Sequence, residues 1–180
     1  MVAYGDVINR ADVKDVITGP VAASTSLVIG LVYEDAANGW KQAPVDGSIS
    51  GQKMYWLDRD TDNSSGSLGD KIITVYGDGA IVVGKADGAI PVDGRVKAST
   101  TASHNGQFIS NPVPTVADEG DTSMTDLGAE IAAATQAVYT YFDQTVGKYL
   151  GNQKERTQSA TSRTAAADED TDCLVKIIRN

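Results

Sequence analysis

The sequence has very few of the residues that usually carry catalysis or covalent cross-links. It contains one cysteine, Cys173, and one histidine, His104, in 180 residues. A lone cysteine excludes a disulfide within the chain, and beside Leu174 we expect Cys173 to be a small buried apolar residue. His104 precedes Asn105-Gly106, and no nearby serine or cysteine is arranged as in a nucleophile elbow. We therefore interpret His104 as a turn residue, and the sequence predicts neither an enzyme nor a catalytic residue.

Long apolar runs and phosphate-binding loops are also missing. No apolar run reaches the roughly 18 residues of a membrane-spanning helix, and residues 1–10 lack the basic-then-apolar pattern of a secretion signal. There is no Walker loop, and the glycines fall between short β-branched runs rather than in strand-to-helix turns. We therefore expect no cofactor and no segment that crosses a membrane.

Positive charge is scarce relative to negative charge. The 15 basic residues face 24 acidic ones, which gives a formal net charge of −9, and most of the acidic residues are aspartate. An acidic surface repels the phosphates of nucleic acids and anionic lipids, so we expect neither a nucleic-acid nor a membrane partner. The charge has two interpretations: ordinary solubility, or adaptation to molar salt, where screening weakens the self-repulsion.

What the sequence does contain is turn chemistry between short β-branched runs. Asp-Gly pairs begin at residues 46, 78, 87 and 93, and Asn-Gly pairs begin at residues 38 and 105. These pairs tolerate the positive φ angles of tight hairpin turns. The runs with strand length and composition are Leu27–Tyr33, Lys53–Leu57, Lys71–Tyr76, Ala80–Lys85, Arg95–Ser99 and Cys173–Ile178. The sequence therefore predicts a mainly β fold, a small antiparallel β-barrel or sandwich with one helix and extended loops or arms.

We expect one domain over residues 1–180, with a β core at 27–99 and a closing strand at 173–178. Apolar residues at three- and four-residue spacing predict a helix over 122–137, and the β-branched and aromatic content of Val138–Phe142 favours a strand over a helical extension. Asp58–Asp70 and Ser110–Asp121 are expected to be loops. Residues 1–15 form an N-terminal segment and 152–172 an exposed arm, and we expect such arms to be ordered only where a partner holds them.

The acidic loop offers the one pattern that is typical of a metal site. Asp58, Asp60 and Asp62 alternate as at the start of an EF-hand loop, but Asn63 replaces the turn glycine and Gly69 replaces the closing glutamate. These aspartates are therefore only weak candidates for metal ligands, and a solvated loop is the preferred interpretation. The same loop contains the triplet Asn63-Ser64-Ser65, which fits a glycosylation acceptor and is permitted by an exposed position.

Aromatic residues cluster in the first half of the chain: Tyr33, Trp40, Tyr55, Trp56 and Tyr76. Tyrosine and tryptophan are typical both of ligand platforms and of the cores of small barrels. Core packing is the preferred interpretation. An exposed Trp40 or Trp56 beside polar groups would instead indicate a carbohydrate-binding surface.

The middle of the chain resembles the head decoration proteins of tailed viruses. The resemblance is carried by LVIGLVYEDAANGWKQAP, DGSISGQKMYW and KIITVYGDGAIVVGKADGAIPVDGRVKAS, with a glycine-and-valine pattern of the form G-x-x-V-x-G. VGKYLG and CLVKII are similar to the closing strands of the same families, so the resemblance covers roughly Leu27–Ser99 and Val146–Ile178. The acidic composition resembles that of proteins from haloarchaeal viruses.

This resemblance implies a small β-barrel that lies on the outer capsid surface of the virion. It implies a homotrimer or similar cyclic oligomer that binds the major capsid protein and cements neighbouring capsomers. Two other functions stay open: a tail or head–tail connector subunit, and a surface carbohydrate-binding module. The residues that would bind a partner cannot be named from the sequence.

Overall fold

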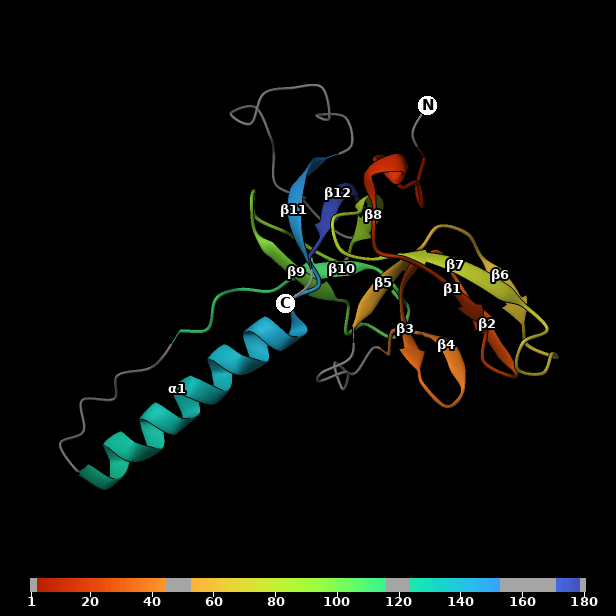
Figure 1. Cartoon of the computed structure of the whole chain (residues 1–180). Helices are drawn as coiled ribbons and strands as arrows, with labels where there is room; N and C mark the ends of the chain where they lie inside the picture. The colour runs from red at the N-terminus through yellow and green to blue at the C-terminus, as the bar shows by residue number, and fades with distance from the viewer. Residues whose placement is uncertain (1–2, 45–52, 116–123, 153–170, 179–180) are drawn as a thin grey trace.

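The computed structural model describes residues 3–44, 53–115, 124–152 and 171–178. Figure 1 shows a mainly β body with one long helix, which confirms the predicted fold class. The elements are a short 3-10 helix η1 (Arg10–Asp12), β1 (Val16–Pro20), β2 (Thr25–Leu27), β3 (Gly30–Asp35), β4 (Gly39–Gln42), β5 (Met54–Leu57), β6 (Thr61–Asn63), β7 (Ile72–Tyr76), β8 (Ile81–Ala86), β9 (Arg95–Ala98), β10 (Phe108–Ser110), α1 (Met124–Gln144), β11 (Gly147–Asn152) and β12 (Thr171–Ile177).

The strands form a five-stranded sheet, a closed barrel and a two-stranded sheet. The order in the first sheet is β1-β7-β5-β3-β4, in the barrel β10-β8-β12-β11-β9, and β2 pairs with β6. The barrel is antiparallel except where Phe108 of β10 meets Ala86 of β8 in parallel. The predicted closing strand is β12, which lies between β8 and β11 and begins at Thr171, two residues before the predicted start.

The five-stranded sheet is packed on both of its faces. Side chains alternate between the faces of a strand. Trp56 of β5 accordingly belongs to the core shared with the barrel, while its neighbours Tyr55 and Leu57 belong to a second core on the other face. Leu31 and Val32 of β3 divide in the same way. The central strands are therefore apolar at consecutive positions, and the barrel and the sheet share one core.

The predicted turns at Asn38-Gly39 and Asp78-Gly79 both form, but only the first joins paired strands. Asn38-Gly39 closes the hairpin β3–β4, with a hydrogen bond of 2.8 Å from Asn38 N to Asp35 O and a φ of +85° at Gly39. Asp78-Gly79 also makes a turn, with a φ of +84° at Gly79, but it connects β7 in the sheet to β8 in the barrel. A turn dipeptide fixes the local reversal, whereas the partner of each strand is chosen by packing over the whole chain.

The N-terminal segment is part of the body, which corrects the expectation of a partner-held arm. Strand β10 reaches β8 only at Ala86, so the rest of that edge of β8 has unpaired backbone groups. Residues 5–8 fill it: Gly5 N donates to Val83 O at 2.9 Å, Val83 N to Asp6 O at 2.9 Å, and Ile8 N to Ile81 O at 2.8 Å. The β core therefore begins well before residue 27.

The helix is longer than predicted, and the strand expected at Val138–Phe142 is wrong. Helix α1 runs to Gln144, so these β-branched and aromatic residues are helical. Strand propensity is a weak preference that context overrides, and the three- and four-residue apolar spacing continues through Val138 and Tyr141. The predicted start at residue 122, the Asp46-Gly47 turn and residues 153–170 of the predicted arm lie outside the described residues.

Candidate interaction surface

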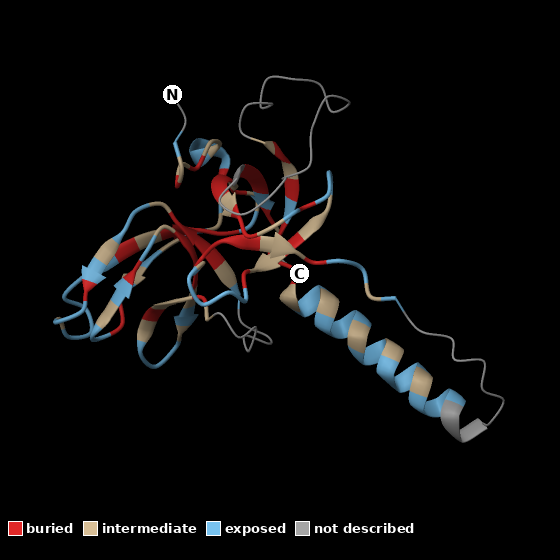
Figure 2. Ribbon diagram, turned by 180° about the vertical axis from the view of Figure 1, so that it is seen from behind, coloured by how far each residue is buried: buried red, intermediate tan, exposed pale blue. Residues whose placement is uncertain are grey.

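Helix α1 projects away from both β layers along most of its length (Figure 1). Figure 2 shows that its described residues are exposed or half-buried almost to the point where the helix joins the barrel. Three of its aliphatic side chains are open to solvent: Leu127 is 47% exposed, Ile131 59% and Val138 42%. We name the row Leu127, Ile131, Ala134, Val138 and Tyr141 the α1 stripe. An apolar row on a projecting helix is a surface suited to another protein.

The C-terminal end of α1 is fixed to the barrel by a buried amide. Asn111, which follows β10 and is 6% exposed, donates from Nδ2 to Tyr141 O and to Thr145 Oγ1, both at 2.9 Å. Thr145 Oγ1 itself donates to Tyr141 O at 2.7 Å. Lys97 Nζ of β9 donates to Gln144 Oε1 at 3.1 Å. These bonds satisfy a carbonyl that the end of a helix leaves without a partner, and they fix the direction in which α1 leaves the body.

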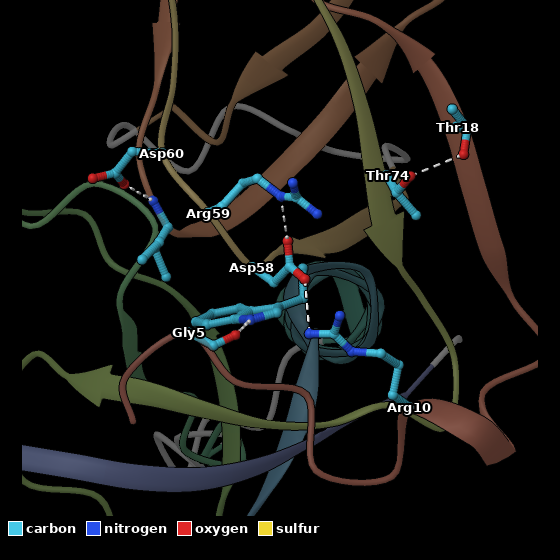
Figure 3. A network of polar contacts seen from close by, with 9 residues as sticks. Gly5, Arg10, Thr18, Asp58, Arg59, Asp60 and Thr74 are labelled. Atoms are coloured by element: carbon cyan, nitrogen blue, oxygen red, sulfur yellow. Dashed lines mark hydrogen bonds and ion pairs between the residues drawn. The ribbon is translucent and has the colours of Figure 1, made fainter. Parts of the chain in front are cut away.

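The three aspartates proposed as weak metal ligands are separated by their own contacts. Asp58 pairs with Arg10 at 2.9 Å and with Arg59 at 3.4 Å, as Figure 3 shows. Asp60 Oδ1 accepts a hydrogen bond of 2.7 Å from the backbone N of Ile29. In the described parts of the chain, no three histidine, cysteine, aspartate or glutamate side chains gather closely enough to hold a metal ion.

Asp62 lies on a short strand rather than in an unstructured loop. It belongs to β6, which pairs with β2, and its Oδ1 accepts hydrogen bonds from Ser26 Oγ at 2.7 Å and from Ser64 N at 2.9 Å. The bond from Ser26, followed by that from the Ser64 backbone, lowers the pKa of Asp62 to about 2. This carboxylate holds the β2–β6 pair together, which explains its position without a cation.

His104 is held by a carboxylate on the barrel. Its Nδ1 lies 2.8 Å from Asp87 Oδ1, and the other oxygen of Asp87 accepts a short hydrogen bond from Ser99 Oγ. The serine therefore bonds to the carboxylate instead of the imidazole, which is not the arrangement of a nucleophilic triad. Burial raises the pKa of Asp87, but the bonds from Ser99 and His104 outweigh it, so the pKa is lowered from 3.8. The cluster fastens the loop between β9 and β10.

Both tryptophans are fully buried, so neither provides a carbohydrate platform. Trp40 meets Tyr55 edge-on at a centroid distance of 5.2 Å, and Trp56 stacks on Phe108 at 5.4 Å. Each indole is 0% exposed. The preferred core interpretation is confirmed for both tryptophans, while Tyr33 of the same cluster is half-buried, and the carbohydrate-binding alternative loses the exposed tryptophan on which it depended.

Asn63 and Cys173 are also core residues. Asn63 is 3% exposed, and its Nδ2 donates to Ala22 O at 2.9 Å and to Ser67 O at 3.1 Å. The acceptor nitrogen of the glycosylation triplet is therefore occupied and buried, which corrects the expectation of an exposed site. Cys173 is 0% exposed within the barrel core, as predicted.

Sequence reasoning found the apolar spacing of α1 but missed the residues that hold it. Asn111 stands between Ser110 and Pro112 and is indistinguishable from an ordinary polar loop residue. Thr145 follows Val138–Phe142, whose β-branched and aromatic composition favours a strand. Only a correct helix end would have revealed that a carbonyl near Tyr141 needs a donor.

Within the described residues, no helix combines the length and apolar character required to cross a membrane. Comparison with protein-family models and with curated proteins found no match for this chain.

Proposed function

We propose that this protein is a structural subunit that decorates the outside of an assembled viral shell, binds the major capsid protein there and stabilises the shell as a cyclic oligomer. One observation carries the proposal: a β body joined to a projecting helix with a solvent-exposed apolar stripe. Such a helix gains most of its stability when another protein covers its apolar face.

The polar side chains of the body support a structural function. Four carboxylates accept hydrogen bonds from other groups of the chain or form ion pairs with them: Asp58, Asp60, Asp62 and Asp87. These contacts fasten the N-terminal segment, the β2–β6 pair and the β9–β10 loop to the body. These contacts give the four carboxylates a structural function in the described part of the chain, which supports a proposal that places binding on the exposed surface.

A subunit that binds only the assembled shell stabilises that shell, because its binding is thermodynamically linked to assembly. A subunit that contacts two neighbouring capsomers buries interface area that only the intact shell offers, so its binding free energy opposes disassembly. The net charge of −9 also directs the subunit to a protein surface rather than to packaged nucleic acid. Both considerations agree with the family that the sequence resembles.

The test adds the purified full chain to shells assembled without it and measures co-sedimentation and the temperature of shell disruption. We expect saturable binding to intact shells and a higher disruption temperature. Unassembled major capsid protein is the control, because a subunit that bridges capsomers binds it far more weakly. Absence of binding to shells, or equal binding to the unassembled protein, would contradict the proposal.

A tail or head–tail connector subunit remains the second candidate. It shares the need for contacts between copies but assembles into a ring of higher order. Electron microscopy of the purified chain separates the two, since a large closed ring favours the connector and a small cyclic oligomer favours decoration.

A further inference from the structure

The α1 stripe has the spacing of a coiled-coil seam. From Leu127 through Ile131, Ala134 and Val138 to Tyr141 the intervals are four, three, four and three residues. Two seam residues in every seven give a mean repeat of 3.5 residues. In a straight helix of 3.6 residues per turn, the five positions lie within an arc of about 80° around the helix axis. A repeat of 3.5 selects another helix as the partner, because two such helices stay in register by winding around each other.

The stripe is not covered by the described part of its own chain. Leu127, Ile131 and Val138 keep between 42% and 59% of their surface exposed. The helix also contains Gly128 and a run of β-branched and aromatic residues, Val138–Phe142, which weaken helix formation in isolation. A partner on the stripe would supply the packing that most protein helices depend on.

The charge pattern of α1 favours a second copy of this chain over an oppositely charged partner. The helix has no lysine or arginine. Glu130 borders the stripe, and Asp143 lies on the far side of the helix. The other positions that flank the stripe are uncharged: Gly128, Thr135, Ala137, Phe142 and Gln144. Like-charge repulsion across a seam between two copies is therefore small, and few acidic groups are placed to attract a basic helix.

We propose that α1 pairs with α1 of a second copy of this chain as a parallel coiled coil whose seam is the α1 stripe. The anchor determines where the β bodies lie in this parallel order. Asn111 fixes the last turn of each helix to its own barrel, so copies arranged around an axis along the helices keep their β bodies at one end. This pairing specifies the contact within the oligomer of the proposed function, but it rests on the helix alone and needs no shell.

The first test measures the mass of the full chain in solution by sedimentation over a range of concentrations. Ile131→Glu places a charge in the seam, and Ala133→Glu places the same charge in the same turn on an exposed face away from the stripe. We expect Ile131→Glu to raise the dissociation constant by about 100-fold or more and Ala133→Glu to change it by less than about 3-fold. Wild-type protein that stays monomeric up to about 100 µM overturns the proposal, as do equal effects of the two variants.

A second variant separates loss of pairing from loss of the helix. Val138→Ala improves intrinsic helix propensity and removes seam volume, so we expect weaker association with undiminished helix content by circular dichroism. Association that is unchanged by Val138→Ala and by Ile131→Glu overturns the stripe as the seam.

Cysteine cross-linking tests the parallel order. Leu127→Cys places thiols of the two copies opposite each other only in a parallel seam, whereas Tyr139→Cys, 68% exposed and off the stripe, is the matched control. We expect oxidation to cross-link Leu127→Cys far more than Tyr139→Cys, and the reverse overturns the parallel arrangement. The buried Cys173 is present in every variant and sets the background.

The measured mass also separates this inference from the proposed function. A dimer or a trimer that is sensitive to Ile131→Glu supports the seam, because β-branched residues at Ile131 and Val138 with Leu127 at the alternate position are compatible with a narrow coiled coil. Such an oligomer that does not bind shells keeps the seam and overturns decoration. A monomer that binds shells keeps decoration and overturns the seam.

Discussion

Trp56 Nε1 donates a hydrogen bond of 2.9 Å to the carbonyl oxygen of Gly5, which lies 51 residues earlier in the chain. The indole also stacks on Phe108 of β10. One buried side chain therefore joins the N-terminal segment, the five-stranded sheet and the barrel. Figure 3 shows the same region, where Arg10 of the N-terminal segment also pairs with Asp58.

The two buried tryptophans are a matched pair for testing this bond. Trp56→Phe leaves the carbonyl of Gly5 without its donor, whereas Trp40→Phe removes a buried Nε1 that has no hydrogen-bond partner among the described residues. Both changes leave a similar cavity. We expect Trp56→Phe to lower the free energy of unfolding by about 2 kcal/mol more than Trp40→Phe does. Urea unfolding of the two variants measures the difference, and an equal loss would show that the bond to Gly5 contributes nothing.

Much of the β body could be predicted because its sequence signals are local. The apolar runs of β3, β5, β7 and β8 and the turn at Asn38-Gly39 are recognisable without tertiary information. The N-terminal segment is different, because its order depends on the edge of β8 near Val82, some 75 residues away in sequence. No local sequence pattern around Val7 predicts that contact.

The candidate surface could be predicted only in part. The spacing of Leu127, Ile131, Ala134 and Val138 predicts a helix. The residues after Val138 have strand propensity, so the sequence does not indicate that the helix continues to Gln144. Asn111 acts as the anchor because its amide donates to the carbonyl of Tyr141 in that last turn. The residue type alone does not reveal which distant side chain will form a hydrogen bond with a buried polar group.

Replacing the anchor should loosen α1 without unfolding the body. In Asn111→Ala the carbonyl of Tyr141 and the hydroxyl of Thr145 lose a donor, so we expect faster amide hydrogen exchange over residues 141–146 and a loss of about 1–2 kcal/mol in unfolding free energy. Gln136→Ala is the control, since its side chain makes only an exposed contact of 3.5 Å to Thr140. Exchange that is equally slow in both variants would contradict the anchoring function of Asn111.

The Asp87 cluster should make stability depend on pH in the acid range. The pKa of Asp87 is lowered from 3.8 in the folded chain, so its stabilisation is present above pH 3.8 and is lost as the pH falls through the lower folded value. Asp87→Asn cannot take up this proton. We expect the difference in unfolding free energy between wild type and Asp87→Asn to be largest near neutral pH and to shrink below pH 3.8. A difference that grows on acidification would show the opposite linkage.

Salt should stabilise the protein if its acidic surface is an adaptation to high salt. Added salt screens the repulsion among the carboxylates that produce the net charge of −9. We expect the thermal midpoint to rise between about 0.1 M and about 3 M potassium chloride. A flat or falling midpoint would leave ordinary solubility as the reason for the charge.

The most direct measurement of the central claim is cryo-electron microscopy of virus particles isolated from cells that produce this chain. The account predicts density for the β body on the outer face of the shell, at the junction between capsomers, with the α1 helices of neighbouring copies packed together. Density in the tail or in a ring at the head–tail junction, or particles without this chain, would contradict decoration of the capsid surface.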